Sequence, residues 1–269
     1  MALRGLRTAA TAVLIVVAAG CAGPSSAPVL STAAASARPS YSEPEPEPES
    51  RLVPSSRQAT ASSVSLLADP TREWNLVVLG DSTGDDPDEF PFLAAEQLGT
   101  VYNRPAIVHR WIGDRGYGEE ATFPSGRDAA PIHVWNGSVS GSVGMYAANN
   151  LEAMTPAGAD LVLINYGHNY AGPQQAREGI SQLLEDIDIH LGRPPILMII
   201  QNPKNPETVL SSAITGQVRS TASAYSCETV DVYSVFKNAV DPDRLLLDDT
   251  HPSPAGSKVW ADTVVKALS

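Results

Sequence analysis

Four short blocks in the C-terminal part of the chain carry the side chains that acyl-transfer chemistry needs. They are Gly80-Asp81-Ser82, residues 136–141 (NGSVSG), residues 166–169 (YGHN) and residues 248–251 (DDTH). A serine hydroxyl becomes an effective nucleophile only with a base in hydrogen-bond reach, and ester cleavage needs hydrogen-bond donors for the oxyanion. The blocks supply a serine, a histidine, glycine N–H groups and an asparagine amide. They therefore indicate serine-dependent cleavage or transfer of an acyl group.

Each side chain has a role that its chemistry suggests. Ser82 is the candidate nucleophile, and His251 would take its proton and return it to the leaving alcohol. Asp248 lies three residues before His251 and could bond the other ring nitrogen, which would fix the tautomer and stabilise the imidazolium. Asp249 is a competing candidate for that orienting role.

The surrounding pattern predicts the elements that must position these residues. Apolar runs predict strands at 74–79, 106–108, 132–135, 160–165, 195–200 and 228–232. Helical patterns lie between them at 90–98, 144–154, 173–191, 207–225 and 253–268. Strands that are apolar throughout are covered on both faces, and their alternation with helices indicates a parallel sheet. We therefore predict an α/β fold, a three-layer α/β/α sandwich with a central parallel sheet.

This fold would bring the four blocks together. In parallel α/β sheets, functional residues collect beyond the carboxyl ends of the strands. Three of the blocks follow predicted strands, and the fourth precedes the last helix. That helix starts with Ser253-Pro254, a good N-cap and a good first residue, which would hold the His251 loop in place.

In their order and placement, the blocks resemble those of the SGNH hydrolases, the GDSL esterase/lipase family. The resemblance covers residues 74–268 and implies a flavodoxin-like sandwich of the SGNH type, ester hydrolysis through an acyl-serine intermediate, and no metal or organic cofactor. It maps the catalytic residues onto Ser82, Asp248 and His251, with the family spacing favouring Asp248 over Asp249. It maps the oxyanion hole onto the Ser82 N–H, the Gly141 N–H and the Asn169 side chain, with Gly137 as the competing glycine.

The sequence departs from the family pattern at two positions. Thr83 follows Gly-Asp-Ser where the family has Leu, which is a mild change. Tyr170 follows Asn169 where the family has Asp, so we expect a different local pocket with the oxyanion role intact.

Composition narrows the partners and domains. The chain has 269 residues, with 18 Lys and Arg against 30 Asp and Glu and a net charge of −12, which argues against nucleic acid as the main partner. Its only two cysteines, Cys21 and Cys227, exclude a disulfide scaffold and the usual multi-cysteine zinc sites. We expect Cys227 to be a buried apolar residue. The length of residues 71–269 suits a single domain, which is the predicted hydrolase domain. We expect this protein to be a monomer.

The N-terminal region is typical of an exported protein. Residues 1–20 have the basic, apolar and small-residue order of a signal peptide, and the apolar run is short for a membrane span. Residues 18–21 (AAGC) resemble a bacterial lipobox, which predicts lipidation of Cys21 and attachment to the cell membrane; simple secretion is the alternative. Residues 21–70 are rich in Ala, Ser, Pro and Glu and predict a disordered tether.

Other chemically capable residues have structural explanations. We expect surface or structural roles for the remaining histidines, His109, His133, His168 and His190. His168 lies in the third block, and a role in shaping the substrate pocket is its alternative. The acidic run at 85–89 is expected to be a solvated loop. Trp111, Tyr117 and Trp135 are expected in the core, with a sugar or acyl pocket as the alternative.

These observations predict a serine esterase at the cell envelope. Its expected substrates are carboxylic esters with short acyl groups, with acetylated glycans as the candidate natural substrates. An acyltransferase that uses envelope sugars in place of water is one alternative. A non-catalytic surface binding module is the other, although the chain retains every proposed catalytic side chain.

Overall fold

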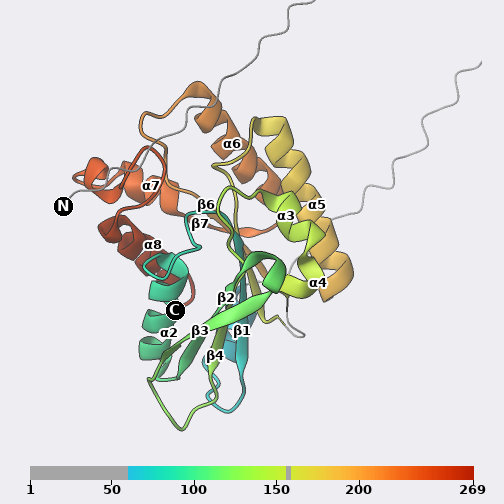
Figure 1. Cartoon of the computed structure of the whole chain (residues 1–269), viewed down its shortest axis with the longest axis vertical. Coiled ribbons are helices and arrows are strands. Elements are labelled where there is room, and N and C mark those ends of the chain that lie inside the picture. Colours follow the sequence, from blue (N-terminus) through green and yellow to red (C-terminus); the bar gives the residue numbers. More distant parts are fainter. Residues whose placement is uncertain (1–59, 156–158) are drawn as a thin grey trace, which may run out of the picture. The chain divides into compact units, whose positions relative to one another are not determined.

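The computed structural model describes residues 60–155 and 159–269 (Figure 1). The predicted signal peptide, Cys21 and most of the predicted tether lie outside the described residues. The described elements are, in chain order, α1 (Thr60–Leu67), β1 (Trp74–Gly80), α2 (Phe90–Tyr102), β2 (Ala106–Trp111), η1 (Gly113–Arg115), β3 (Tyr117–Phe123), β4 (Ile132–Asn136), α3 (Gly144–Asn149), α4 (Leu151–Met154), β5 (Leu161–Asn165), α5 (Pro173–Leu191), β6 (Ile196–Ile200), α6 (Val209–Ala224), β7 (Glu228–Asp231), α7 (Val232–Lys237), η2 (Pro242–Leu245) and α8 (Pro254–Ala267).

The sheet confirms the predicted α/β architecture and adds one strand. Seven strands lie in the order β3-β2-β4-β1-β5-β6-β7, and all neighbours are parallel except β2 and β3. Every residue of β5 and β6 is buried, as their continuous apolar runs predicted. The sequence did not predict β3, whose YGEEATF carries two adjacent glutamates and has no buried residue. It lies at the edge of the sheet, where charged side chains discourage further pairing.

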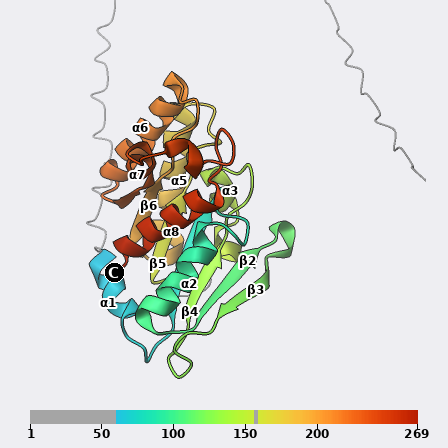
Figure 2. The same ribbon diagram turned by 90° about the vertical axis from the view of Figure 1, so that its left-hand side faces the viewer.

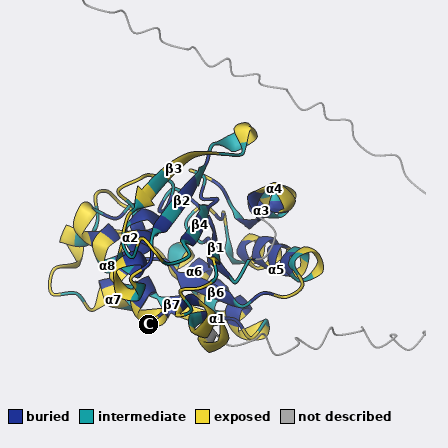
Figure 3. Cartoon of the chain, turned by 90° about the horizontal axis from the view of Figure 1, so that it is seen from below, coloured by how far each residue is buried: buried dark blue, intermediate teal, exposed yellow. Residues whose placement is uncertain are grey.

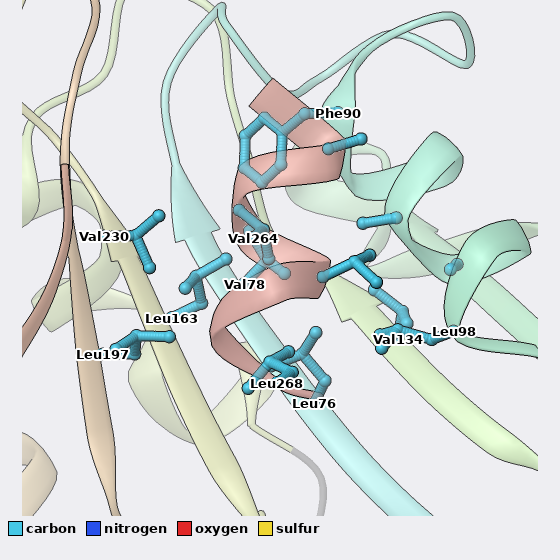
Figure 4. Close-up of a cluster of buried hydrophobic side chains, with 14 of the residues drawn as sticks. Leu76, Val78, Phe90, Leu98, Val134, Leu163, Leu197, Val230, Val264 and Leu268 are labelled. Carbon is cyan, nitrogen blue, oxygen red and sulfur yellow. The ribbon is translucent and has the colours of Figure 1, made fainter. Parts of the chain in front are cut away.

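Helices cover both faces of the sheet and divide the core in two. On one face α1, α2, α7 and α8 pack against one set of alternating strand residues. Figure 4 shows this core, where Val264 and Leu268 at the end of the chain lie against Leu76 and Val78 of β1. On the other face α3 to α6 cover the remaining strand residues, such as Val77. Helix α5 packs against them with its apolar stripe. The two helical layers are visible on either side of the sheet in Figure 3.

Residues 60–70 correct the predicted extent of the tether. The tether was expected to reach residue 70, but 60–67 form α1, and Leu67 is fully buried in the core. Arg104 explains this attachment, because its guanidinium is 0 % exposed and donates hydrogen bonds to the carbonyl oxygens of Leu67, Arg72, Ala130 and Pro131. A short stretch resembling a tether in composition is thus part of the folded domain; Figure 2 shows α1 beside the end of α8.

Other elements also differ from the prediction: α2 and β2 extend beyond their predicted ends, and α7 was not predicted. The helix expected over 144–154 is divided into α3 and α4 at Asn150. The strand expected over 228–232 ends at Asp231, because the Asp231 side chain accepts a hydrogen bond from the Ser234 N–H and caps α7. An N-cap of this kind competes with continued strand geometry.

Candidate active site

The candidate residues lie at the carboxyl ends of three adjacent central strands. Ser82 follows β1, Gly141 lies in the loop after β4, and Asn169 follows β5; β1 pairs with both of the other strands. Asp81 is fully buried, and its Oδ1 accepts hydrogen bonds from the N–H and the hydroxyl of Thr83 at 3.1 and 2.8 Å. This tight turn places Ser82 just beyond the carboxyl end of β1, where it is partly exposed.

Ser82, His251 and Asp248 form a hydrogen-bonded chain. Ser82 Oγ lies 2.9 Å from His251 Nε2, and His251 Nδ1 lies 2.8 Å from Asp248 Oδ2. A carboxylate accepts only, so Nδ1 carries the proton and Nε2 is left to accept from the serine hydroxyl. This is the tautomer that a general base requires.

The loop that carries His251 is fixed by its backbone. Leu246 and Pro252 form an antiparallel bridge, the Leu247 N–H donates to the His251 carbonyl, and the Ser253 N–H donates to the Leu245 carbonyl. Ser253 also caps α8 through Gly256, which confirms the predicted helix start.

Asp248 is held as a carboxylate. Its Oδ1 accepts from the N–H groups of Thr250 and His251 at 2.8 and 2.7 Å. These hydrogen bonds, first of all that from the His251 N–H, lower the pKa of Asp248 to about 2. Asp249 has no hydrogen bond or ion pair from its side chain to His251 among the described residues; its carbonyl accepts from the Asn205 N–H. The geometry therefore places Asp248, and not Asp249, on the imidazole.

The three predicted oxyanion donors lie in the loops that follow the adjacent strands β1, β4 and β5. Asn169 Nδ2 donates to the Ser142 carbonyl at 3.0 Å, which ties the amide to the loop that carries Gly141. Gly141 has a φ of +73°, a left-handed conformation that glycine adopts without strain. Within the described residues, the N–H groups of Ser82 and Gly141 have no hydrogen-bond partner, whereas the Gly137 N–H already donates to the Val78 carbonyl. Gly137 is thus unavailable for the role.

The two departures from the family pattern have structural explanations. Thr83 is buried, and its hydroxyl accepts a hydrogen bond from Asn165 Nδ2 at 2.9 Å as well as donating to Asp81. Tyr170 is buried and accepts from the Gly144 N–H at 3.0 Å, which fixes the loop after β5 to the start of α3; burial raises its pKa to about 12. Both residues therefore support the loops of the site.

The remaining sequence candidates lie in packed surroundings. His109 and His133 share a hydrogen bond of 2.9 Å on the sheet, and His109 stacks on Trp135 at 3.9 Å between ring centroids. Trp111 and Tyr117 pack edge to face beside them. The acidic run at 85–89 is, by contrast, largely solvated, as expected, because Asp86 and Asp88 are exposed; Glu89 is partly buried, and this burial raises its pKa to about 8. Cys227 is buried, as predicted.

A cavity of about 250 Å³ lies between the ends of β5 and β6 and the start of α6. Its wall is mainly apolar and includes His168, the neighbour of Asn169, as well as Ile214 and Val218. None of the three triad residues lines it. No group of three or more metal-binding side chains is present among the described residues. No described helix meets the length and hydropathy needed to cross a membrane.

This arrangement defines a class of protein. A serine, a histidine and an aspartate in hydrogen-bond sequence, on an α/β/α sandwich and beside an amide and two unengaged N–H groups, are the parts of a serine hydrolase. The profile of the family described as GDSL-like lipase/acylhydrolase matches residues 76–264. The chain belongs to this family of ester hydrolases. Among curated proteins, none matches the chain.

Solved structures share the fold at low sequence identity. A lipase/acylhydrolase from Enterococcus faecalis is 15% identical with a TM-score of 0.54, over 72% of this chain and 95% of that one. A two-domain esterase active on acetylated mannans is 15% identical with a TM-score of 0.59, over 79% of this chain and 54% of that one. A variant of an acetyl xylan esterase from Geobacillus stearothermophilus is 16% identical with a TM-score of 0.52, over 73% and 94%.

Proposed function

We propose that this protein is a serine esterase that hydrolyses carboxylic esters through an acyl-Ser82 intermediate. The observation that carries the proposal is the hydrogen-bonded chain from Ser82 through His251 to Asp248. In the first half-reaction Ser82 Oγ attacks the ester carbonyl while His251 Nε2 takes its proton, and His251 then protonates the departing alcohol. In the second half-reaction His251 deprotonates a water that attacks the acyl-serine, and Ser82 leaves with the proton.

The oxyanion of each tetrahedral intermediate would accept hydrogen bonds from the N–H groups of Ser82 and Gly141 and from Asn169 Nδ2. Donors that are already in place need no reorganisation as charge develops on the oxygen. The exposure of the triad favours hydrolysis over transfer, because the side chains of His251 and Asp248 are 37% and 54% exposed and water reaches them freely.

We further propose a short acyl group as the substrate, with an acetylated glycan as its natural carrier. Two of the proteins that share the fold are described as acting on acetylated mannans and acetyl xylan. An envelope location, proposed from residues 1–21, would place the enzyme near cell-wall glycans. Replacing Cys21 with Ser tests this location: the variant should move from the membrane to the soluble fraction, and a variant that stayed on the membrane would contradict lipidation.

The test of the activity is a series of p-nitrophenyl esters from acetate to palmitate, with Ser82→Ala as the control. The proposal expects turnover that is highest for the shortest chains and absent in Ser82→Ala. Analysis of the products with a sugar acceptor present separates free acid, the product of hydrolysis, from an acylated sugar. Two folded proteins with no turnover of any ester would contradict the proposal and favour a binding module.

A further inference from the structure

The segment that follows β6 connects three of the loops of the candidate site, those that carry Ser82, Asn169 and His251. Gln201, Asn202 and Lys204 lie directly beyond the end of this strand, and the first two are only 5% and 1% exposed. Burying a primary amide is unfavourable unless its donors and acceptors are paired. Three of the four polar atoms of these two amides are paired, and only Asn202 Oδ1 has no hydrogen-bond partner among the described residues, so the positions of the partners show what the segment holds in place.

Gln201 connects the nucleophile turn to the oxyanion loop. Its Nε2 donates to Asp81 Oδ2 at 3.0 Å, and its Oε1 accepts from the His168 N–H at 2.8 Å. Asp81 precedes Ser82 in the chain, and His168 precedes Asn169. The close approach has a second sign, because a Cβ atom on Gly167 would lie 2.6 Å from Gln201 Oε1. A side chain at position 167 would therefore require the Gln201 amide to shift.

Asn202 connects the oxyanion loop to the loop of the general base. Its carbonyl accepts from His168 Nε2 at 2.9 Å, and its Nδ2 donates to the Thr250 carbonyl at 2.9 Å. Thr250 directly precedes His251. Lys204 completes the set, since its Nζ donates to the His168 carbonyl at 3.1 Å. His168 is thus held at its N–H, its side chain and its carbonyl by one four-residue segment.

We infer that Gln201 and Asn202 are positioning residues that set the geometry between Ser82, Asn169 and His251. The inference rests on the proposed function, because it concerns the alignment of that catalytic chain. Gln201 acts through Asp81 and His168, and Asn202 acts through Thr250 and His168. Misplacement of reacting groups by about 1 Å can lower a rate by about 100-fold, so loss of either side chain should affect turnover more than substrate binding.

The test compares two variants with a control in β6, the strand that precedes the segment. Gln201→Met keeps the length of the side chain and removes both polar atoms, and Asn202→Ala removes the bond to Thr250. Leu197→Val is the control, because Leu197 lies in β6 and packs in the hydrophobic core away from the loops. Thermal unfolding of all three shows how much stability each has lost. Values of kcat and KM are then measured on p-nitrophenyl acetate.

The inference expects kcat to fall about 10- to 100-fold in each variant, with KM changed less than about threefold and Leu197→Val close to wild type. A spectroscopic signature accompanies this result. The low-field proton resonance of His251 Nδ1–H should persist in the wild type and in Leu197→Val, and should shift or broaden in Asn202→Ala.

Two results would overturn the inference. One is a kcat within about twofold of the control for both folded variants, which leaves the esterase proposal intact as long as Ser82→Ala is inactive. The other is a loss of kcat in proportion to the loss of thermal stability in all three variants, Leu197→Val included. If the wild type itself is folded and turns over no ester, the proposed function fails first, and the positioning role fails with it.

Discussion

Exchanging Asp248 for asparagine is the most informative perturbation of the triad. In the wild type the carboxylate accepts from His251 Nδ1–H at 2.8 Å. In Asp248→Asn the carboxamide keeps the size and can still accept from the backbone N–H groups, but the negative charge is lost. If its NH₂ faces the imidazole, Nδ1 must accept, and the proton moves to Nε2. Nε2 can then no longer accept the proton of Ser82.

The size of the effect follows from the charge and its exposure. Opposite unit charges about 4 Å apart attract by about 1 kcal/mol in water and about 4 kcal/mol at an effective dielectric constant of about 20. The side chains of Asp248 and His251 are 54% and 37% exposed, so screening places the imidazolium–carboxylate pair between these limits, at about 2–3 kcal/mol. Because 1.36 kcal/mol is a factor of ten in rate, this charge accounts for about 30- to 150-fold. The wrong tautomer brings the expected loss of kcat to about 10²–10³-fold.

Asp249→Asn is the matched control, since it makes the same chemical change one residue away. The assay is steady-state turnover of p-nitrophenyl acetate at a fixed pH, with circular dichroism to show that both variants are folded. The reasoning predicts a large loss in Asp248→Asn and a change of less than about threefold in Asp249→Asn. It is refuted if Asp248→Asn keeps more than about a tenth of the wild-type kcat, or if Asp249→Asn is the more impaired variant.

Three other substitutions test separate parts of the structure. Asn169→Ala removes one oxyanion donor and should lower kcat about 10²–10³-fold with little change in KM; an unchanged kcat would remove Asn169 from the oxyanion hole. Arg104→Met removes four hydrogen bonds from a fully buried guanidinium to carbonyl oxygens and should lower the free energy of unfolding by about 3 kcal/mol or more in urea titrations, whereas the same change at the exposed Arg127 should have almost no effect. Glu89 has a folded-state pKa raised to about 8, so its stabilising contribution is complete below about pH 4.5 and is lost as the pH rises through 8. Glu89→Gln should therefore raise Tm relative to the wild type at pH 8–9 and match it near pH 4, and Tm values equal to the wild type at both pH values would contradict burial of this carboxyl group.

The parts of the fold that the sequence predicted are those whose pattern reflects burial. Runs such as 161–164 and 196–200 are apolar throughout because both faces of β5 and β6 are covered, and their short length favours strands over helices. The runs of β1 and β5 are followed by polar blocks. The sequence therefore predicted that Ser82 and Asn169 lie beyond the carboxyl ends of these strands. The structure brings these side chains together with His251 and Asp248; their catalytic roles remain predictions until turnover is measured.

The elements that escaped prediction are those whose formation depends on distant residues. The edge strand β3 exists because β2 offers it an unpaired side, and its own sequence has no apolar alternation. Helix α1 has the composition of a tether and is held by Arg104, more than 35 residues away. The residues Gln201-Asn202-Pro203 resemble an ordinary turn, and only the hydrogen bonds to Asp81, His168 and Thr250 reveal their connections. A Gly at position 167 was the one local signal of that close approach.

The most direct test of the central claim is the site of covalent modification by an organophosphate such as diethyl p-nitrophenyl phosphate. The reagent phosphorylates an activated serine and mimics the tetrahedral intermediate, so mass spectrometry of digested protein identifies the nucleophile. The account predicts one adduct, on Ser82, formed in step with the loss of esterase activity and absent in both Ser82→Ala and His251→Ala. An adduct on another residue, or ester turnover that persists in Ser82→Ala, would contradict it.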